Sequence, residues 1–193
     1  MLERRYLYAQ SLQVERRADQ RVVIRGHAAV FNSLSENLGG FREQIAPGAF
    51  STAIQTDDVR ALLNHDPNLV LGRNKAGTLR LAEDSQGLAI EIDPPDTQTA
   101  RDLMVSMKRG DITQMSFGFS VRHGGESWSK DPAGMHVRTL SKVRLFDVSP
   151  VTYPAYTATD VSVALRSLEQ FRRSSDRWRT SLRLKMLRLR ELG

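Results

Sequence analysis

Short segments of strand composition recur at hairpin spacing along this chain, and that spacing limits the fold more than any other feature of the sequence. Residues 70–73, 78–83 and 87–93 are rich in strand-forming side chains, and glycine-containing turns separate them. Turns this short join neighbouring antiparallel strands. The sequence therefore predicts an antiparallel meander over residues 70–93.

Similar segments lie on both sides of this meander. Alternating or β-branched stretches predict two strands within residues 6–30 and single strands at 41–45, 59–63, 112–122 and 136–148. Helices are predicted at 51–56 and between residues 94–97, which offer an N-cap, and Gly110, and residues 123–134 are predicted to be a polar loop. Because strands outnumber helices, we expect a mainly β fold with flanking helices, built as an antiparallel β-barrel or strongly twisted sheet.

The positive charge is concentrated at the C-terminal end. The net charge is +6 at pH 7, and residues 166–193 account for all of it with nine basic and three acidic side chains. The remaining part is neutral overall, so no dedicated nucleic-acid site is expected. We expect a β-barrel domain over residues 1–165 and a basic, amphipathic helical tail over residues 166–193.

An apolar stripe within this tail has two interpretations. It consists of residues at helical spacing: Trp178, Leu182, Met186 and Leu189. The stripe could dock on the chain's own domain, or it could bind a coiled-coil scaffold or an acidic shell surface. Both interpretations stay open, and membrane binding is the weaker alternative.

The residue types exclude several kinds of chemistry. The chain has no cysteine, which excludes disulfides and a cysteine nucleophile. The four histidines lack the short spacings of metal ligands, and no glycine-rich phosphate loop is present. No secretory signal and no membrane-spanning apolar run occur. We expect a redox-indifferent protein without metal, cofactor or membrane segment, made inside the cell.

Ser116 and His65 are the candidates for nucleophilic catalysis. Ser116 lies on the face of its predicted strand opposite Met115, Phe117 and Phe119, and Gly118 leaves room beside it. His65 follows a buried strand, where an imidazole can accept the proton of a serine hydroxyl. Spacing alone leaves open that both are structural polar residues.

Four segments resemble one known family and occur in its order. They are residues 45–50 (Ile-Ala-Pro-Gly-Ala-Phe), 62–66 (Leu-Leu-Asn-His-Asp) with 71–73 (Leu-Gly-Arg), 114–119 (Gln-Met-Ser-Phe-Gly-Phe) and 146–156 (Phe-Asp-Val-Ser-Pro-Val-Thr-Tyr-Pro-Ala-Tyr). Together they resemble the caudovirus prohead serine protease family, which is similar in fold and chemistry to the herpesvirus assemblins. The resemblance implies an assemblin-like β-barrel.

The resemblance also implies a site and a function. By motif match, Ser116 is the nucleophile, His65 is the general base, and Asp147 is the third member, with His136 as its rival. The implied activity is a serine endopeptidase that cleaves scaffold and major capsid proteins, inside the procapsid in the host cytoplasm. Apart from the resemblance, the place of Arg144 on the strand leading to Asp147 makes it a candidate for the oxyanion hole, and the alternative is an arginine that faces solvent.

The alternative from another class is a non-catalytic capsid-assembly or scaffold-binding protein on the same fold. The presence of both Ser116 and His65 disfavours it. The sequence leaves self-association open.

Overall fold

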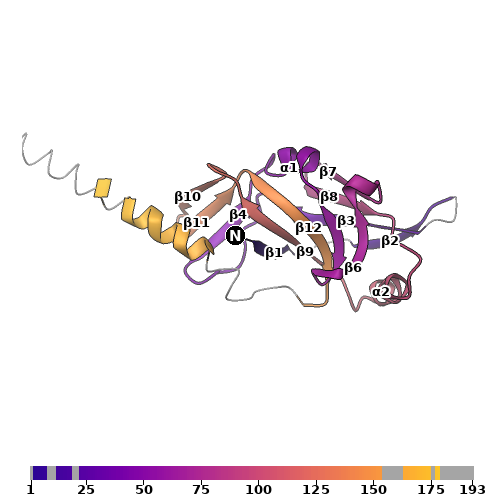
Figure 1. Cartoon of the computed structure of the whole chain (residues 1–193). Helices are drawn as coiled ribbons and strands as arrows, with labels where there is room; N and C mark the ends of the chain where they lie inside the picture. Colours follow the sequence, from indigo (N-terminus) through magenta and orange to yellow (C-terminus); the bar gives the residue numbers. More distant parts are fainter. Residues whose placement is uncertain (1, 8–11, 19–21, 154–162, 175–176, 179–193) are drawn as a thin grey trace, which may run out of the picture.

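The computed structural model describes residues 2–7, 12–18, 22–153, 163–174 and 177–178 and forms three β-sheets (Figure 1). The five-stranded sheet has the order β1 (Glu3–Leu7), β9 (Gln114–Val121), β12 (Val143–Val151), β5 (Arg60–Leu63) and β6 (Asp66–Arg73). The four-stranded sheet has the order β2 (Gln13–Arg16), β3 (Val22–Val30), β8 (Gly87–Ile92) and β7 (Leu79–Glu83). The three-stranded sheet has the order β10 (Glu126–Lys130), β11 (His136–Leu140) and β4 (Phe41–Ile45).

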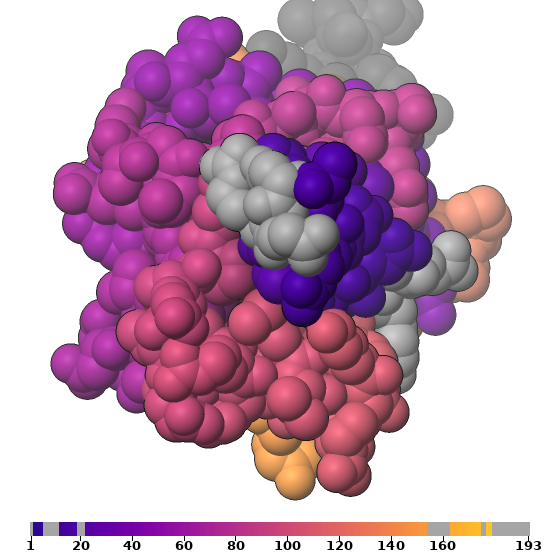
Figure 2. Space-filling view, turned by 90° about the vertical axis from the view of Figure 1, so that its right-hand side faces the viewer, coloured from indigo at the N-terminus to yellow at the C-terminus, as the bar shows by residue number. Residues whose placement is uncertain are grey.

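Helices cover the ends of these sheets. They are α1 (Ser51–Thr56), the short 3₁₀ turn η1 (Asn74–Ala76), α2 (Gln98–Arg109) and a helix over residues 163–174. The Thr97 hydroxyl accepts a hydrogen bond from the amide of Ala100, and Gly110 ends α2 in the left-handed conformation at φ 83°. The predicted limits of α2 are thus confirmed. At one end of the molecule α2 lies beside β2 (Figure 2).

Most of the core lies between the five- and four-stranded sheets. Met115, Phe117 and Phe119 on β9 are fully buried, as their alternation predicted. The rings of Phe117 and Phe119 stack at 5.0 Å, and Phe50 meets Phe117 edge-on at 5.6 Å. Burial of each such side chain contributes roughly 1.5–3 kcal/mol. This packing fixes β9, and with it the position of Ser116.

A second, smaller core lies under the C-terminal helix. Ala164 and Leu168 are buried against Leu38 and Phe41, and the ring of Trp128 stacks on Phe171 at 6.3 Å. The helix over residues 163–174 therefore runs across the boundary expected between residues 165 and 166. The stripe residues Leu182, Met186 and Leu189 lie outside the described residues, and Trp178 is exposed.

The sheets differ from the prediction in their closure and their pairing. Among the described residues no sheet closes into a barrel, because β1 and β6 each end the five-stranded sheet. The pairing is mostly antiparallel, as predicted, but β4 pairs with β11 and β5 with β12 in parallel. The meander predicted over residues 70–93 is wrong in its first strand, because β6 pairs with β5 in another sheet and only β7 and β8 pair with each other. The mainly β fold class is confirmed, and the closed barrel is not what the structure forms.

Three parts of the secondary structure were predicted wrongly. Two strands were predicted within residues 6–30, whereas β2, β3 and the end of a third strand, β1, lie there, and β1 begins at Glu3. Residues 126–130 form β10 within the predicted polar loop; Trp128 is its only large apolar residue, so the alternation was too sparse to reveal a strand. The single strand predicted over 136–148 is two strands, β11 and β12. The amides of Ser141 and Lys142 turn aside to the carbonyl oxygen of Gly125, which separates them. No helix in the described part of the chain is long and apolar enough to cross a membrane.

Candidate active site

A two-residue turn between β5 and β6 carries His65. Leu63 pairs with Asp66, so only Asn64 and His65 lie in the turn. Both have positive φ, 54° and 57°, the pattern of the hairpin turn whose twist suits antiparallel strands. A histidine rarely adopts this conformation, and such backbone persists where surrounding contacts hold it in place.

Asn64 supplies those contacts to the end of β12. Its amide donates to the carbonyl oxygen of Pro150 at 3.0 Å, and its side-chain oxygen accepts from the amide of Thr152 at 2.8 Å. Its Nδ2 donates to the Thr152 hydroxyl at 3.2 Å. Asparagine tolerates the left-handed conformation and offers both a donor and an acceptor. Asn64 therefore fixes the turn, and with it the backbone of His65, against β12.

The His65 imidazole lies between Ser116 and Asp147. Its Nε2 is 2.7 Å from Ser116 Oγ, and its Nδ1 is 2.5 Å from Asp147 Oδ1. With Nδ1–H donating to the carboxylate, Nε2 of the neutral ring is free to accept the serine proton. The structure thus brings together the three residues that the family motifs pointed to, from β9, β12 and the turn after β5.

A β-bulge and a glycine allow Asp147 to reach the imidazole. The register of β12 against β9 shifts between Leu145 and Asp147, which leaves Phe146 as an extra residue. A Cβ atom on Gly118 would lie 2.2 Å from Asp147 Oδ2, so any other side chain at this position would collide with the carboxylate. The Ser149 hydroxyl also donates to Asp147 Oδ1, at 2.7 Å, and holds its orientation.

The residues around Asp147 extend what the sequence indicated. Gly118 was expected to clear space beside Ser116, whereas its missing side chain makes room for the Asp147 carboxylate. Ser149 and Asn64 were not predicted to support the site. Both lie within the family-like segments, and that position is the only signal that could have pointed to them.

His136 and Arg144, the two other candidates, lie elsewhere. His136 is on β11, where its ring meets Phe171 edge-on at 6.1 Å. Burial lowers the pKa of His136, and the charges of Arg172 and Lys130 lower it further. Arg144 is exposed, with its guanidinium 5.1 Å from the centre of the Phe146 ring. Neither has a recorded contact with Ser116, His65 or Asp147.

The described residues contain no group of three or more acidic, histidine or cysteine side chains that could hold a metal ion. The donor set at Ser116, His65 and Asp147 is the one that acyl transfer through a serine uses.

Comparison with known proteins identifies the family. The model of the caudovirus prohead serine protease family matches residues 10–174. The chain belongs to this family. The resemblance seen in the four sequence segments is thereby confirmed, and the family is one of prohead serine proteases.

A solved structure similar to this chain is the capsid assembly protease gp21 of bacteriophage T4. It shares 11% sequence identity, with a TM-score of 0.49, and the match covers 77% of this chain and 98% of gp21. No curated protein matches the sequence.

The contact between Gly118 and Asp147 leads to a prediction. We expect Gly118→Ala to push the carboxylate away from His65, because the added Cβ has no space. A misplacement of about 1 Å at a catalytic group lowers activity by roughly a hundredfold. Cleavage of a protein substrate, with circular dichroism as a check on folding, would measure this loss. Full activity in a folded Gly118→Ala variant would contradict the packing described.

Proposed function

We propose that this chain is an endopeptidase that cleaves scaffold and major capsid proteins during procapsid maturation, inside the immature shell in the host cytoplasm. The observation that carries the proposal is the position of the His65 imidazole, 2.7 Å from Ser116 Oγ and 2.5 Å from Asp147 Oδ1. Membership of the prohead serine protease family supports proteins of the prohead as the substrates.

The proposed reaction proceeds by acyl transfer. Ser116 Oγ attacks the peptide carbonyl carbon while His65 Nε2 takes its proton. His65 then gives that proton to the leaving amine, and an acyl ester forms on Ser116. Water, deprotonated by the same imidazole, hydrolyses the ester and restores the serine. Asp147 keeps Nδ1 protonated and stabilises the imidazolium that forms in each step.

The experiment that tests this function is co-expression with the capsid protein from the same gene cluster. Intact mass measurement should reveal a capsid protein shortened at a defined peptide bond, with no mass added to either fragment beyond water. An unshortened capsid protein that nevertheless assembles with this chain would favour the alternative, a non-catalytic assembly protein.

The third catalytic role can be tested separately. We expect Asp147→Ala to lower the cleavage rate by roughly 10⁴-fold, less than removal of the nucleophile or base, because the carboxylate orients the imidazole without reacting. His136→Ala serves as the matched control and should cleave as the unaltered chain does. An inactive His136→Ala variant beside a fully active Asp147→Ala variant would transfer the role to His136.

The C-terminal residues have a proposed role in recruitment. Residues 166–193 carry the net charge of +6, which suits attraction to an acidic shell or scaffold surface. The helix over residues 163–174 already packs on the three-stranded sheet. Recruitment is therefore assigned to the residues that follow this helix.

One observation favours the non-catalytic alternative. Ser116 is 0% exposed, and a protein substrate cannot reach a hydroxyl that is fully covered. The nature of this cover decides whether the site can act.

A further inference from the structure

Strand β1 covers Ser116. It is the edge strand of the five-stranded sheet and pairs antiparallel with β9, with Tyr6 directly opposite Ser116. The carbonyl oxygen of Arg5 accepts a hydrogen bond from Ser116 Oγ at 2.9 Å. A Leu2 methyl lies 3.5 Å from the ideal Cβ position of Gly118, on the side of the Asp147 carboxylate. The first residues of the chain thus lie across the proposed catalytic group.

The bond to Arg5 competes with catalysis. A serine hydroxyl carries one proton, which it can donate to only one acceptor at a time. While that proton points to the Arg5 oxygen, it is not directed at His65 Nε2, the atom that has to remove it. In this arrangement the hydroxyl is shielded from substrate, and its proton is shared with the Arg5 oxygen although Oγ stays 2.7 Å from the imidazole.

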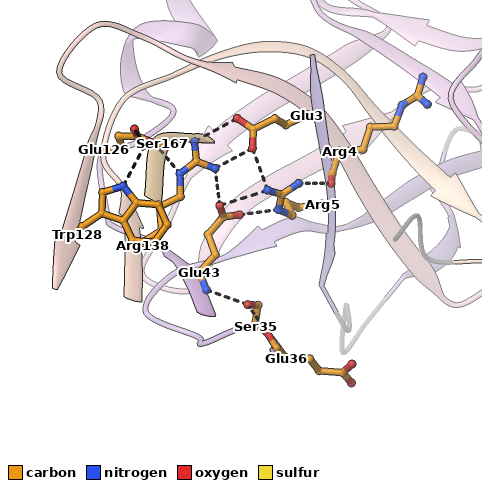
Figure 3. A network of polar contacts seen from close by, with 10 residues as sticks. All are labelled: Glu3, Arg4, Arg5, Ser35, Glu36, Glu43, Glu126, Trp128, Arg138 and Ser167. Carbon is orange, nitrogen blue, oxygen red and sulfur yellow. Dashed lines mark hydrogen bonds and ion pairs between the residues drawn. The ribbon is translucent and has the colours of Figure 1, made fainter. Parts of the chain in front are cut away.

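Charged side chains anchor β1, as Figure 3 shows. Arg5 Nε donates to Glu43 Oε1 at 2.7 Å, and Arg5 Nη2 donates to Glu3 at 2.9 Å. Arg138 Nη1 donates to Glu3 Oε2 at 2.7 Å and to Glu43 Oε2 at 2.8 Å. These four residues are at most 6% exposed. The anchor is therefore a buried ion network between β1 and the three-stranded sheet.

An anchor of this kind allows β1 to leave. Glu3 and Arg5 carry opposite charges, so their departure would not change the net charge of the ion network that they leave behind. Arg138 would keep its partners Glu43 and Glu126, the latter at 2.6 Å. Buried ions regain their hydration when they are released, which offsets part of the energy of the lost ion pairs. Within β1 the structure describes the side chains of Glu3, Arg4 and Arg5. All three are charged, and none belongs to the apolar cores.

We propose that β1 is a self-inhibitory strand, which holds the place of an extended substrate segment and has to leave β9 before Ser116 can react. This inference rests on the proposed function, because it describes the regulation of the same site. When β1 leaves, residues 115–119 become a free strand edge beside the nucleophile. An extended segment of a capsid or scaffold protein can pair with that edge through its main chain.

Access to position 116 can be measured without catalysis. The chain has no cysteine, so Ser116→Cys introduces a single thiol. We expect Glu3→Ser/Arg5→Ser to raise the rate of its alkylation by iodoacetamide by about tenfold or more, because local opening exposes the strand. Asp96→Ser/Arg101→Ser, which removes an exposed ion pair of the same net charge, is the matched control and should leave the rate unchanged. Equal rates in all three chains would overturn the inference.

A second variant tests the strand without weakening its anchor. Continuing the register by one residue places Leu2 opposite Ser120, within the distance that a disulfide spans. In the Leu2→Cys/Ser120→Cys chain, oxidation should fix β1 on β9. We expect labelling of Ser116 by a fluorophosphonate probe to fall by about tenfold or more on oxidation and to return on reduction. Equal labelling of the oxidised and reduced forms would overturn the inference.

The two measurements separate the inference from the function on which it rests. Faster alkylation of the Ser116→Cys thiol in the Glu3→Ser/Arg5→Ser background supports the self-inhibitory strand. If the Glu3→Ser/Arg5→Ser chain with Ser116 intact never reacts with the fluorophosphonate, the strand still covers position 116, but the proposed function is wrong. Rapid labelling that is independent of β1 leaves the function intact and overturns the strand's role.

Discussion

Ser116→Ala should abolish cleavage of the capsid protein while the chain stays folded. The rate is expected to fall by roughly 10⁶-fold, and His65→Ala should cause a similar loss, because nucleophile and base act as one unit. The serine Oγ lies 2.7 Å from the imidazole, so either substitution removes the proton transfer. Intact mass measurement after co-expression would report the uncleaved capsid protein.

Ser120→Ala is the matched control for this experiment. Ser120 lies on β9 four positions after Ser116 and pairs with Arg144 on β12. Its loss should leave cleavage unchanged. A Ser116→Ala variant that still shortens the capsid protein would refute the assignment of the nucleophile.

Arg138→Met should cause the largest loss of stability. Arg138 is 1% exposed and bonds to Glu3, Glu43 and Glu126. Burial lowers the pKa of Arg138, but its hydrogen bond to Glu3 and the nearby carboxylate charges outweigh burial and raise the pKa above its usual value. The guanidinium therefore stays charged at any working pH, and its removal leaves buried carboxylates without a full set of counter-charges.

Breaking such a buried network lowers the free energy of unfolding by about 3–5 kcal/mol. Denaturant-induced unfolding of the full chain would measure the change. Arg101→Met removes an arginine whose exposed ion pair joins it to Asp96, and it should change stability by less than about 1 kcal/mol. A similar small effect for Arg138→Met would mean that the network carries little of the stability.

The sequence predicted the elements that follow a regular apolar alternation. On β9 this alternation places Met115, Phe117 and Phe119 in the core and leaves Ser116 on the other face. The helix α2 was predictable because Thr97 and Gly110 mark its ends. Ser116, His65 and Asp147 were found through motifs, and the structure brings their side chains into contact.

The division into three sheets could not be predicted, because it depends on pairings between distant parts of the chain. The parallel contact of β12 with β5 joins only two residue pairs, Asp147 with Arg60 and Val148 with Ala61. No local pattern specifies so short a ladder. The strand β10 was missed for a related reason, since its inward residues are Glu126 and Trp128, of which only one is apolar.

The cover over Ser116 was hidden for a different reason. Glu3 and Arg5 alternate along β1 as the charged residues of a solvent-facing strand would. Their partners lie on β4 and β11, 38 and 135 residues away for the pairs Arg5–Glu43 and Glu3–Arg138. Charge alone does not indicate whether a side chain meets water or another charge. The buried network is therefore visible only in three dimensions.

The packing of Gly118 against Asp147 has a consequence for how related sequences can diverge. Since a Cβ at position 118 would lie 2.2 Å from the Asp147 carboxylate, the two positions are sterically coupled. A relative with a larger residue at the position of Gly118 can keep its backbone only if the residue at the position of Asp147 is shorter or turned away. The two positions are therefore expected to covary, and a substitution at one should be tolerated only after a change at the other.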